Sequence, residues 1–351
     1  MIKAEDRTYI KDIPYKSADD FLHAISYGGD LYSLFNERFI FRGHSSDSYE
    51  LQPSVLRENL FYDKFGTKKE YTEKEILFAN TEFSQVFIEY QLLEEFFNKC
   101  DETQLFIPEV RRMRESIVFN FKGLSLLYSE GKWLPEELYE LTALAQHHGV
   151  RTRLLDWTRD INVALYFAVS GALHRRFSPK LMTRSQWAEK CKKDLESIRN
   201  RTQSESDDDK PNIEIWALDN RLEIDYLKDI PLRIIHPRYY DNENLGAQKG
   251  ILTCWEIKKP KCFDKVGGLQ PELHPKDSRT LDELIVEFLN MNKKEDTPSK
   301  PYLYHITIPE SEILPLYAYL KRNRCDAVHL FPGYDGVVKC MKEERLYYNN
   351  K

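Results

Sequence analysis

The stretch that decides the fold is LAQHHGVRTRLLDWTRDINVALYFAV, residues Leu144 to Val169. Two apolar segments with helical spacing enclose a short run of polar and aromatic side chains. Polar groups held between two rigid supports are typical of a binding or catalytic site. We therefore predict a functional site in this polar run, which consists of Gln146, His147, His148, Arg151, Thr152, Arg153, Asp156, Trp157 and Thr158.

A helix is predicted immediately before the polar run. Leu138, Leu141 and Ala145 repeat at helical spacing, and acidic residues stand at the start of the segment, where the helix dipole favours them. Gly149 is placed to end this helix in a left-handed conformation.

A second helix is predicted after the polar run, with Thr158 or Asp160 as its N-cap. Asp156, Trp157 and Thr158 would then lie in a turn at a helix N-terminus, where backbone N–H groups and the helix dipole attract an anion. The structural alternative is that Thr158 only caps the helix and Trp157 belongs to the core. In that case Asp156 would pair with Arg151 or Arg153.

An earlier segment, RFIFRG at residues 38–43, is predicted to be a strand because it combines aromatic and β-branched residues and closes with a glycine. Alternation directs Phe39 and Phe41 to one face and Arg42 to the other. Arg42 then projects at the strand end. Gly43 beside it allows another backbone or a ligand to come close.

The two motifs, taken together, resemble the FRG domain family, which is named for a Phe-Arg-Gly triplet. FRGHSSDSYELQPSVLR at Phe41–Arg57 and AQHHGVRTRLLDWTRDINVALYFA at Ala145–Ala168 stand in the family's order. A third, weaker match is NENLGAQKGILT at Asn242–Thr253, where Glu243 and Ile251 replace the basic and aromatic residues that the family favours.

The resemblance covers roughly residues 37–255, and a family-like LFPGYDG stands at Leu330–Gly336. We expect an α+β fold, with a mixed or antiparallel sheet, several helices packed around it and a helix-rich N-terminal half. Residues 1–36 are expected to be a helical lead-in. Residues 37–255 would form the FRG-like domain, with an exposed insertion at about 174–210, and residues 256–351 would add strands and helices to the same domain.

Composition narrows the class of protein. At 351 residues, with 31% charged and 41% apolar residues, the chain is long and apolar enough to fold around a sizeable core. A net charge of −6 argues against unspecific coating of nucleic acid, because that affinity comes from Lys and Arg displacing counterions. The N-terminus lacks the apolar segment of a signal peptide, and no apolar run is long enough to span a bilayer. The expected location is cytoplasmic, and the six scattered cysteines are expected to be free thiols.

Several standard sites are absent from the sequence. No phosphate loop, dinucleotide-binding fingerprint, zinc helix or nucleophile elbow occurs. The adjacent His147 and His148 would point about 100° apart on a helix and are poorly placed to bind one metal ion. We expect neither a metal site nor a permanently bound cofactor.

What remains favours a nucleotide, because arginine forks suit phosphate and aromatic rings suit bases. The order of motifs is also similar to that of NAD-consuming ADP-ribosyltransferases. That similarity implies that Arg42 clamps NAD, that Thr152 and Thr158 orient it, and that Gln248 or Asp156 stabilises the oxocarbenium-like ribose. The implied catalytic residues are Arg42, Asp156 and Gln248, and the implied substrate-binding residues are Gly43, Gln146, His147, Thr152, Trp157 and Thr158.

Two other hypotheses stay open. The same groove could belong to a non-catalytic module that binds nucleic acid or a partner protein through Arg151 and Arg153. Alternatively, the motif residues could form a buried polar network that only fixes the fold. NAD consumption by a transferase or glycohydrolase, in a toxin-like or defence effector, is the first hypothesis.

Overall fold

The computed structural model describes residues 8–35, 37–57, 72–115, 132–178, 211–226, 229–239, 242–258, 275–292 and 300–351. Almost all of the predicted insertion at about 174–210 lies outside these ranges, as do Cys191 and Cys262. The four cysteines inside them are buried free thiols. None of the helices in these ranges has the length and apolar character needed to cross a membrane.

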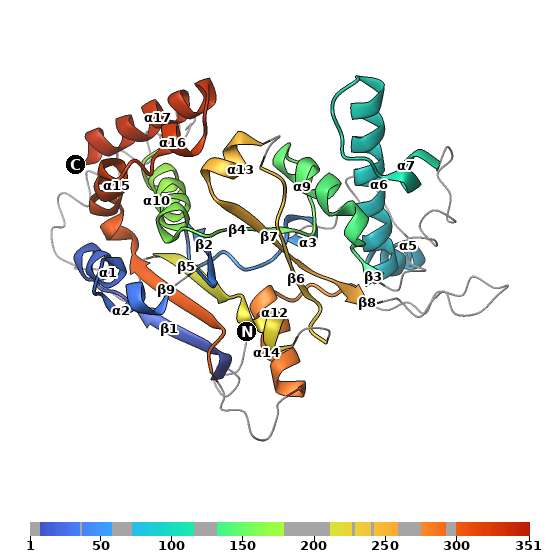
Figure 1. The fold of residues 1–351 in the computed structure, drawn as a ribbon, viewed down its shortest axis with the longest axis horizontal. Coiled ribbons are helices and arrows are strands. Elements are labelled where there is room, and N and C mark those ends of the chain that lie inside the picture. Colours follow the sequence, from blue (N-terminus) through green and yellow to red (C-terminus); the bar gives the residue numbers. More distant parts are fainter. Residues whose placement is uncertain are drawn as a thin grey trace.

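A seven-stranded sheet forms the centre of the molecule (Figure 1). Its strands stand in the order β1-β9-β5-β2-β4-β7-β6. The β1–β9 pair is parallel and all the other pairs are antiparallel, which confirms the predicted α+β class with a mixed sheet. The strands are β1 (Ile10–Pro14), β2 (Phe39–His44), β4 (Leu155–Thr158), β5 (Asn212–Asp219), β6 (Leu232–Ile235), β7 (Gly250–Trp255) and β9 (Leu303–Pro309).

One face of the sheet is covered by helices that share a large apolar core with β2, β5 and β9. Phe39 and Phe41 of β2 point into this core, which confirms the face predicted for them. The helices are α1 (Ala18–Ile25), α2 (Asp30–Leu34), α10 (Ile161–Phe177), α15 (Ile313–Arg322), α16 (Ala327–Leu330) and α17 (Tyr334–Asn350).

The opposite face carries a second core, to which Ile40 of β2 belongs. Short helices α12 (Arg221–Asp225) and α14 (Leu281–Met291) cover it. Strand β2 is therefore buried on both faces, and in the strand order it lies between β5 and β4, in the interior of the sheet. Helices occur in both halves of the described chain.

A third core lies beside β6 and β7, at the right of Figure 1. It contains α6 (Glu82–Glu102), α7 (Arg111–Glu115), the 3-10 turn Glu136–Leu138, α9 (Tyr139–His147) and a small sheet of β3 (Lys132–Trp133) and β8 (Ile257–Lys258). The periodic segment from Thr72 to Lys99 is divided between α5 (Glu73–Ala79) and α6. The Thr81 side chain accepts a hydrogen bond from Ser84 N, so Thr81 is an N-cap at which a new helix begins.

The N-terminal segment contains a strand in addition to the expected helices. Ser17 caps α1 by accepting from Asp20 N. Before it, β1 pairs with β9 at the edge of the sheet, with Asp12 opposite His305. Of the five residues of this edge strand only Ile10 is buried, so its charged residues hide the usual apolar alternation.

The feature that positions the site is a gap between β2 and β4. The two strands pair only at Phe41 and Thr158, whereas β2 pairs with β5 along its whole length. Two residues beyond that bridge, Gly43 of β2 lies against the backbone of α10. A Cβ atom on Gly43 would stand 1.9 Å from Ala164 O, so the close approach predicted for this glycine is confirmed.

Candidate functional site

A cavity of about 270 Å³ opens where β2 and β4 diverge. Arg42 and Gly43 line it from β2, and residues of β4 line it from the other side. Helix α10 and the short helix α13 (Glu243–Ala247) complete the walls. The predicted site residues that line this cavity are Arg42, Gly43, Asp156, Trp157, Thr158 and Gln248.

Asp156, Trp157 and Thr158 lie on a strand, so the prediction of a turn at a helix N-terminus was wrong. Asp156 pairs with Leu252 of β7, and the helix begins only after Asp160. The Asp160 carboxylate accepts from Asn162 N at 2.9 Å and so occupies the helix N-terminus that we had expected to bind an anion.

Arg42 reaches across the gap between the two strands. Its Nη1 donates to the backbone oxygen of Asp156 at 2.6 Å and lies 3.9 Å from Oδ2 of the same residue. Its side chain is 16% exposed. Burial lowers the pKa of Arg42, Asp156 opposes this shift, and the neighbouring Arg57 adds to it. The partner of Asp156 is therefore Arg42, not Arg151 or Arg153.

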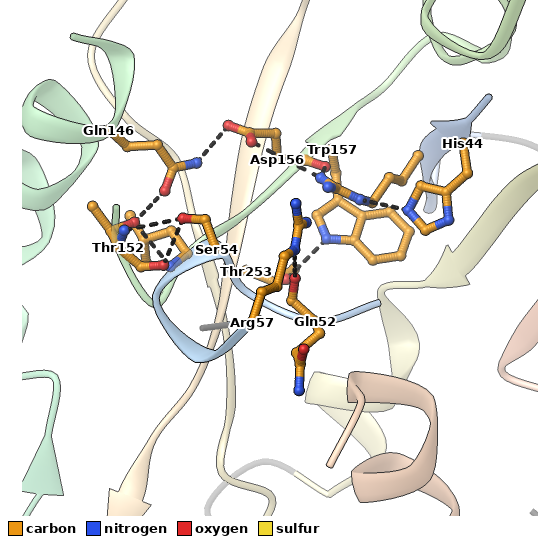
Figure 2. A network of polar contacts seen from close by, with 11 residues as sticks. His44, Gln52, Ser54, Arg57, Gln146, Thr152, Asp156, Trp157 and Thr253 are labelled. Carbon is orange, nitrogen blue, oxygen red and sulfur yellow. Dashed lines mark hydrogen bonds and ion pairs between the residues drawn. The ribbon is translucent and has the colours of Figure 1, made fainter. Parts of the chain in front are cut away.

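Asp156 presents a carboxylate that is both exposed and oriented. Its side chain is 67% exposed, and Oδ1 accepts from Gln146 Nε2 at 2.6 Å. The Thr152 hydroxyl donates to Oε1 of Gln146 and accepts from Leu154 N at 3.1 Å. Figure 2 shows this chain of contacts from Thr152 through Gln146 to Asp156. This order of donors and acceptors fixes the orientation of the Gln146 amide, which in turn holds the Asp156 carboxylate in one rotamer.

Thr152 also holds the segment after the Phe-Arg-Gly motif. Its backbone oxygen accepts from Val55 N and from the Ser54 hydroxyl, both at 3.3 Å, and its backbone nitrogen donates to Ser54 Oγ at 3.2 Å. Thr152 and Gln146 do not line the cavity. We assign them a positioning role in place of the predicted ligand contact.

Trp157 and Thr158 shape the cavity rather than offer polar groups to it. Trp157 is 3% exposed, and its indole N–H donates to Thr253 Oγ1 at 2.9 Å. The Thr158 hydroxyl donates to Gln248 O at 2.7 Å and accepts from Asp160 N at 3.1 Å. Both side chains have their polar groups satisfied inside the protein.

Gln248 joins the third motif to the C-terminal one. Its Nε2 donates to Leu330 O at 3.0 Å, which ties the end of α13 to α16. A neutral amide engaged in this way stabilises a cation less than a free carboxylate does. Of the two predicted candidates for that role, Asp156 has the better placement.

His147 stands at the end of α9 and is exposed, outside the cavity lining. Burial of its ring lowers the pKa of His147, the adjacent His148 lowers it further, and Asp156 opposes both. His147 is therefore within electrostatic reach of the Asp156 carboxylate. In the ranges that the structure describes, no group of three His, Cys, Asp or Glu side chains converges as a metal ion requires.

The sequence did not single out His44, which supports Arg42 from behind. Arg42 Nε donates to His44 Nε2 at 3.1 Å, so that nitrogen carries no proton. Burial lowers the pKa of His44, and the Glu214 carboxylate opposes this shift. The neutral His44 ring therefore holds the Arg42 side chain in place by a hydrogen bond and adds no second positive charge beside it.

Behind His44, a row of charged side chains crosses the neighbouring strands. Glu214 lies 3.6 Å from His44 Nδ1 and 2.8 Å from His305 Nε2, and Asp12 lies 3.0 Å from His305 Nδ1. Burial alone would lower the pKa of His305, but Glu214 and Asp12 outweigh it and raise that pKa. In the sequence, the sign of this row of charged side chains is Glu214, an acidic residue within the otherwise apolar segment IEIWAL.

A second cavity, of about 240 Å³, is lined by Arg153, Trp255, Glu256 and Arg279 among others. None of the residues predicted to bind substrate lines it. Its charges are neutralised locally: Arg153 contacts Glu89 at 2.7 Å, and Glu256 contacts Lys132 and Arg233. The Arg42 cavity is therefore the stronger candidate for a ligand.

The family model of the FRG domain matches residues 37–176. This match confirms the resemblance to the FRG domain family over that range. The matched range includes Arg42, Gln146, Thr152 and Asp156, whereas the Gln248 wall of the cavity lies beyond it. It ends well before residue 255, to which the motif resemblance had extended. Comparison with curated proteins and with solved structures gave no match.

Proposed function

We propose that the FRG domain binds NAD in the Arg42 cavity and cleaves its bond between nicotinamide and ribose. The observation that carries this proposal is the convergence of Arg42 and Asp156, from distant parts of the chain, on one open cavity. A guanidinium suits the pyrophosphate of a dinucleotide, and an exposed carboxylate suits the positive charge that develops on the ribose.

In the proposed reaction the glycosidic C–N bond breaks and nicotinamide leaves with the bonding electrons. The ribose carbon becomes oxocarbenium-like, and the Asp156 carboxylate stabilises it electrostatically. Water, or the nucleophile of an acceptor, then forms the new bond to that carbon and releases a proton. The products are nicotinamide, a proton and either free or transferred ADP-ribose.

The size of the cavity suits one end of the dinucleotide. Ligand pockets commonly measure about 300–1,000 Å³, so a cavity of about 270 Å³ lies just below this range. We infer that the nicotinamide riboside end enters the cavity beside Asp156. The pyrophosphate would lie at Arg42, and the adenosine would lie outside.

The test is release of nicotinamide from NAD, followed by chromatography, together with NAD binding followed by calorimetry. We expect Asp156→Asn to bind NAD but to lose most turnover. Arg42→Ala should bind NAD at least tenfold more weakly, the effect of losing a charge-assisted hydrogen bond worth about 1.5–3 kcal/mol. Arg322→Ala, an exposed arginine on α15, is the matched control and should behave as wild type. Absence of NAD binding at millimolar concentration refutes the proposal.

The second candidate, a nucleic-acid-binding module, rests on Arg151 and Arg153. Arg151 is exposed, but Arg153 is 6% exposed and forms a bidentate pair with Glu89. A buried, paired guanidinium is not available to a phosphate backbone, so this candidate retains only one of its two arginines. It predicts nucleic-acid retention that falls steeply with salt and is lost in Arg151→Ala.

A further inference from the structure

We propose that Arg57 and Arg42 together form an anion site beside the cavity, which binds the phosphate or pyrophosphate of a nucleotide. The identity of the ligand as a nucleotide rests on the proposed function. The anion site itself rests on the placement and charge of the two guanidinium groups, which the following contacts establish.

Arg57 ends α3 (Ser54–Arg57), the last residue of the motif that begins at Phe41. Its Nε donates to Gln52 O at 3.0 Å, which leaves both Nη groups to point elsewhere. Figure 2 shows the side chain extending from the α3 segment toward Trp157. Arg42 is hydrogen-bonded to the backbone of Asp156, next to Trp157, so the two guanidinium groups approach the same part of β4; the positive charge of Arg57 also lowers the pKa values of Arg42 and His44, in addition to the larger effect of burial.

The charges around this position do not balance. Among the described residues, no carboxylate forms an ion pair with Arg57, and none accepts a hydrogen bond from Nη2 of Arg42. The carboxylate that pairs with Arg42 is that of Asp156, whose Oδ2 lies 3.9 Å from Nη1 and whose Oδ1 accepts from Gln146. The Asp156 side chain is 67% exposed and therefore largely hydrated, so it compensates the positive charge of the two guanidinium groups only in part. An anion with several oxygens would complete the arrangement, because guanidinium forks bind such groups through two parallel hydrogen bonds.

The support of Arg57 is rigid on two sides. Gln52 Nε2 donates to Ser278 O at 2.5 Å, and Leu281 N donates to Leu51 O at 2.8 Å. On the other side, Ser54 is held by Thr152, the residue that also orients the Gln146 amide. The same contact therefore places the anion site and the Asp156 carboxylate relative to each other. A preorganised site loses little conformational entropy when the ligand binds.

The experiment is calorimetric titration at low salt with four probes: inorganic phosphate, pyrophosphate, ADP and adenosine. The proteins are the wild type, Arg57→Ala, Arg57→Lys and the control Arg322→Ala, each checked for folding by circular dichroism. We expect pyrophosphate and ADP to bind the wild type and adenosine to bind at least tenfold more weakly. Arg57→Ala should weaken pyrophosphate and ADP about tenfold, since one charge-assisted contact is lost, and Arg57→Lys should weaken them less.

The outcomes separate this inference from the proposed reaction. Pyrophosphate binding that is lost in Arg57→Ala supports the anion site even if the protein leaves NAD intact. Equal pyrophosphate affinity in the wild type and Arg57→Ala overturns the anion site even if NAD is cleaved. Failure of the wild type to bind pyrophosphate or ADP also overturns it.

Discussion

Replacing Gly43 by alanine tests how β2 and α10 frame the cavity. A Cβ atom at this position would stand 1.9 Å from Ala164 O and 3.0 Å from Ala168 N. Ordinary contacts of such an atom begin at 3.4 Å, so the overlap with the carbonyl is 3.4 − 1.9 = 1.5 Å. Both neighbours are backbone atoms of α10, which has to move as a whole to relieve the clash.

The expected loss of stability follows from this overlap. Overpacked cores lose about 1–3 kcal/mol when side chains can shift, so we expect a loss of about 3 kcal/mol or more here. The free energy of unfolding is measured by urea denaturation, followed by circular dichroism. The control is Gly149→Ala: Gly149 has a φ of +88° and nothing within 4 Å of an added Cβ. That variant suffers only left-handed strain, about 1 kcal/mol.

The reasoning is refuted if Gly43→Ala unfolds at the same urea concentration as the wild type. It is also refuted if Gly149→Ala loses more stability than Gly43→Ala does. Because Gly43 lines the cavity, the shift of α10 should also reduce ligand binding in any fraction that remains folded.

Three further predictions concern charge and positioning. Burial lowers the pKa of His44 in the native state, so below about pH 6.5 the unfolded chain binds a proton more readily than the native protein does. The free energy of unfolding of the wild type should therefore approach that of His44→Gln as the pH falls below this value. Glu89→Gln leaves buried Arg153 without its partner and should cost about 3–5 kcal/mol in urea denaturation, whereas Lys99→Gln, which breaks an exposed pair, should leave the midpoint unchanged. Gln146→Leu should lower the kcat of NAD cleavage with little change in KM, because it removes only the orientation of the Asp156 carboxylate. A loss of NAD binding as large as the loss of kcat would contradict a positioning role for Gln146.

The elements that the sequence predicted well have local signals. Gly149 takes a φ of +88° after α9, and Asp160 caps α10, because caps and left-handed glycines act within a few residues. The strand at Arg38–Gly43 was also predictable, since its aromatic residues are buried against the large helical face.

The elements that were predicted wrongly depend on distant partners. Strand β4 has four residues and an exposed aspartate, so it has little strand character of its own; β7 and one bridge to β2 hold it in place.

The site shows the same division. The residue types were predicted, and Arg42 and Asp156 do share a cavity. The contact between Arg42 and Asp156 was not predicted, because the alternation of residues along β2 indicates the face on which Arg42 lies but not the residue of another strand that it contacts. Nor did the sequence separate Thr152, which positions another side chain, from residues that face the ligand. Arg57 was quoted as the end of a motif, but only the three-dimensional arrangement places it near Arg42.

The most direct test of the central claim is a crystal structure of the protein soaked with NAD. We predict density for the nicotinamide riboside end beside the Asp156 carboxylate, with the pyrophosphate at Arg42. Density for NAD elsewhere on the molecule, or a cavity without ligand at saturating NAD, would contradict the claim that this gap between β2 and β4 is a nucleotide site.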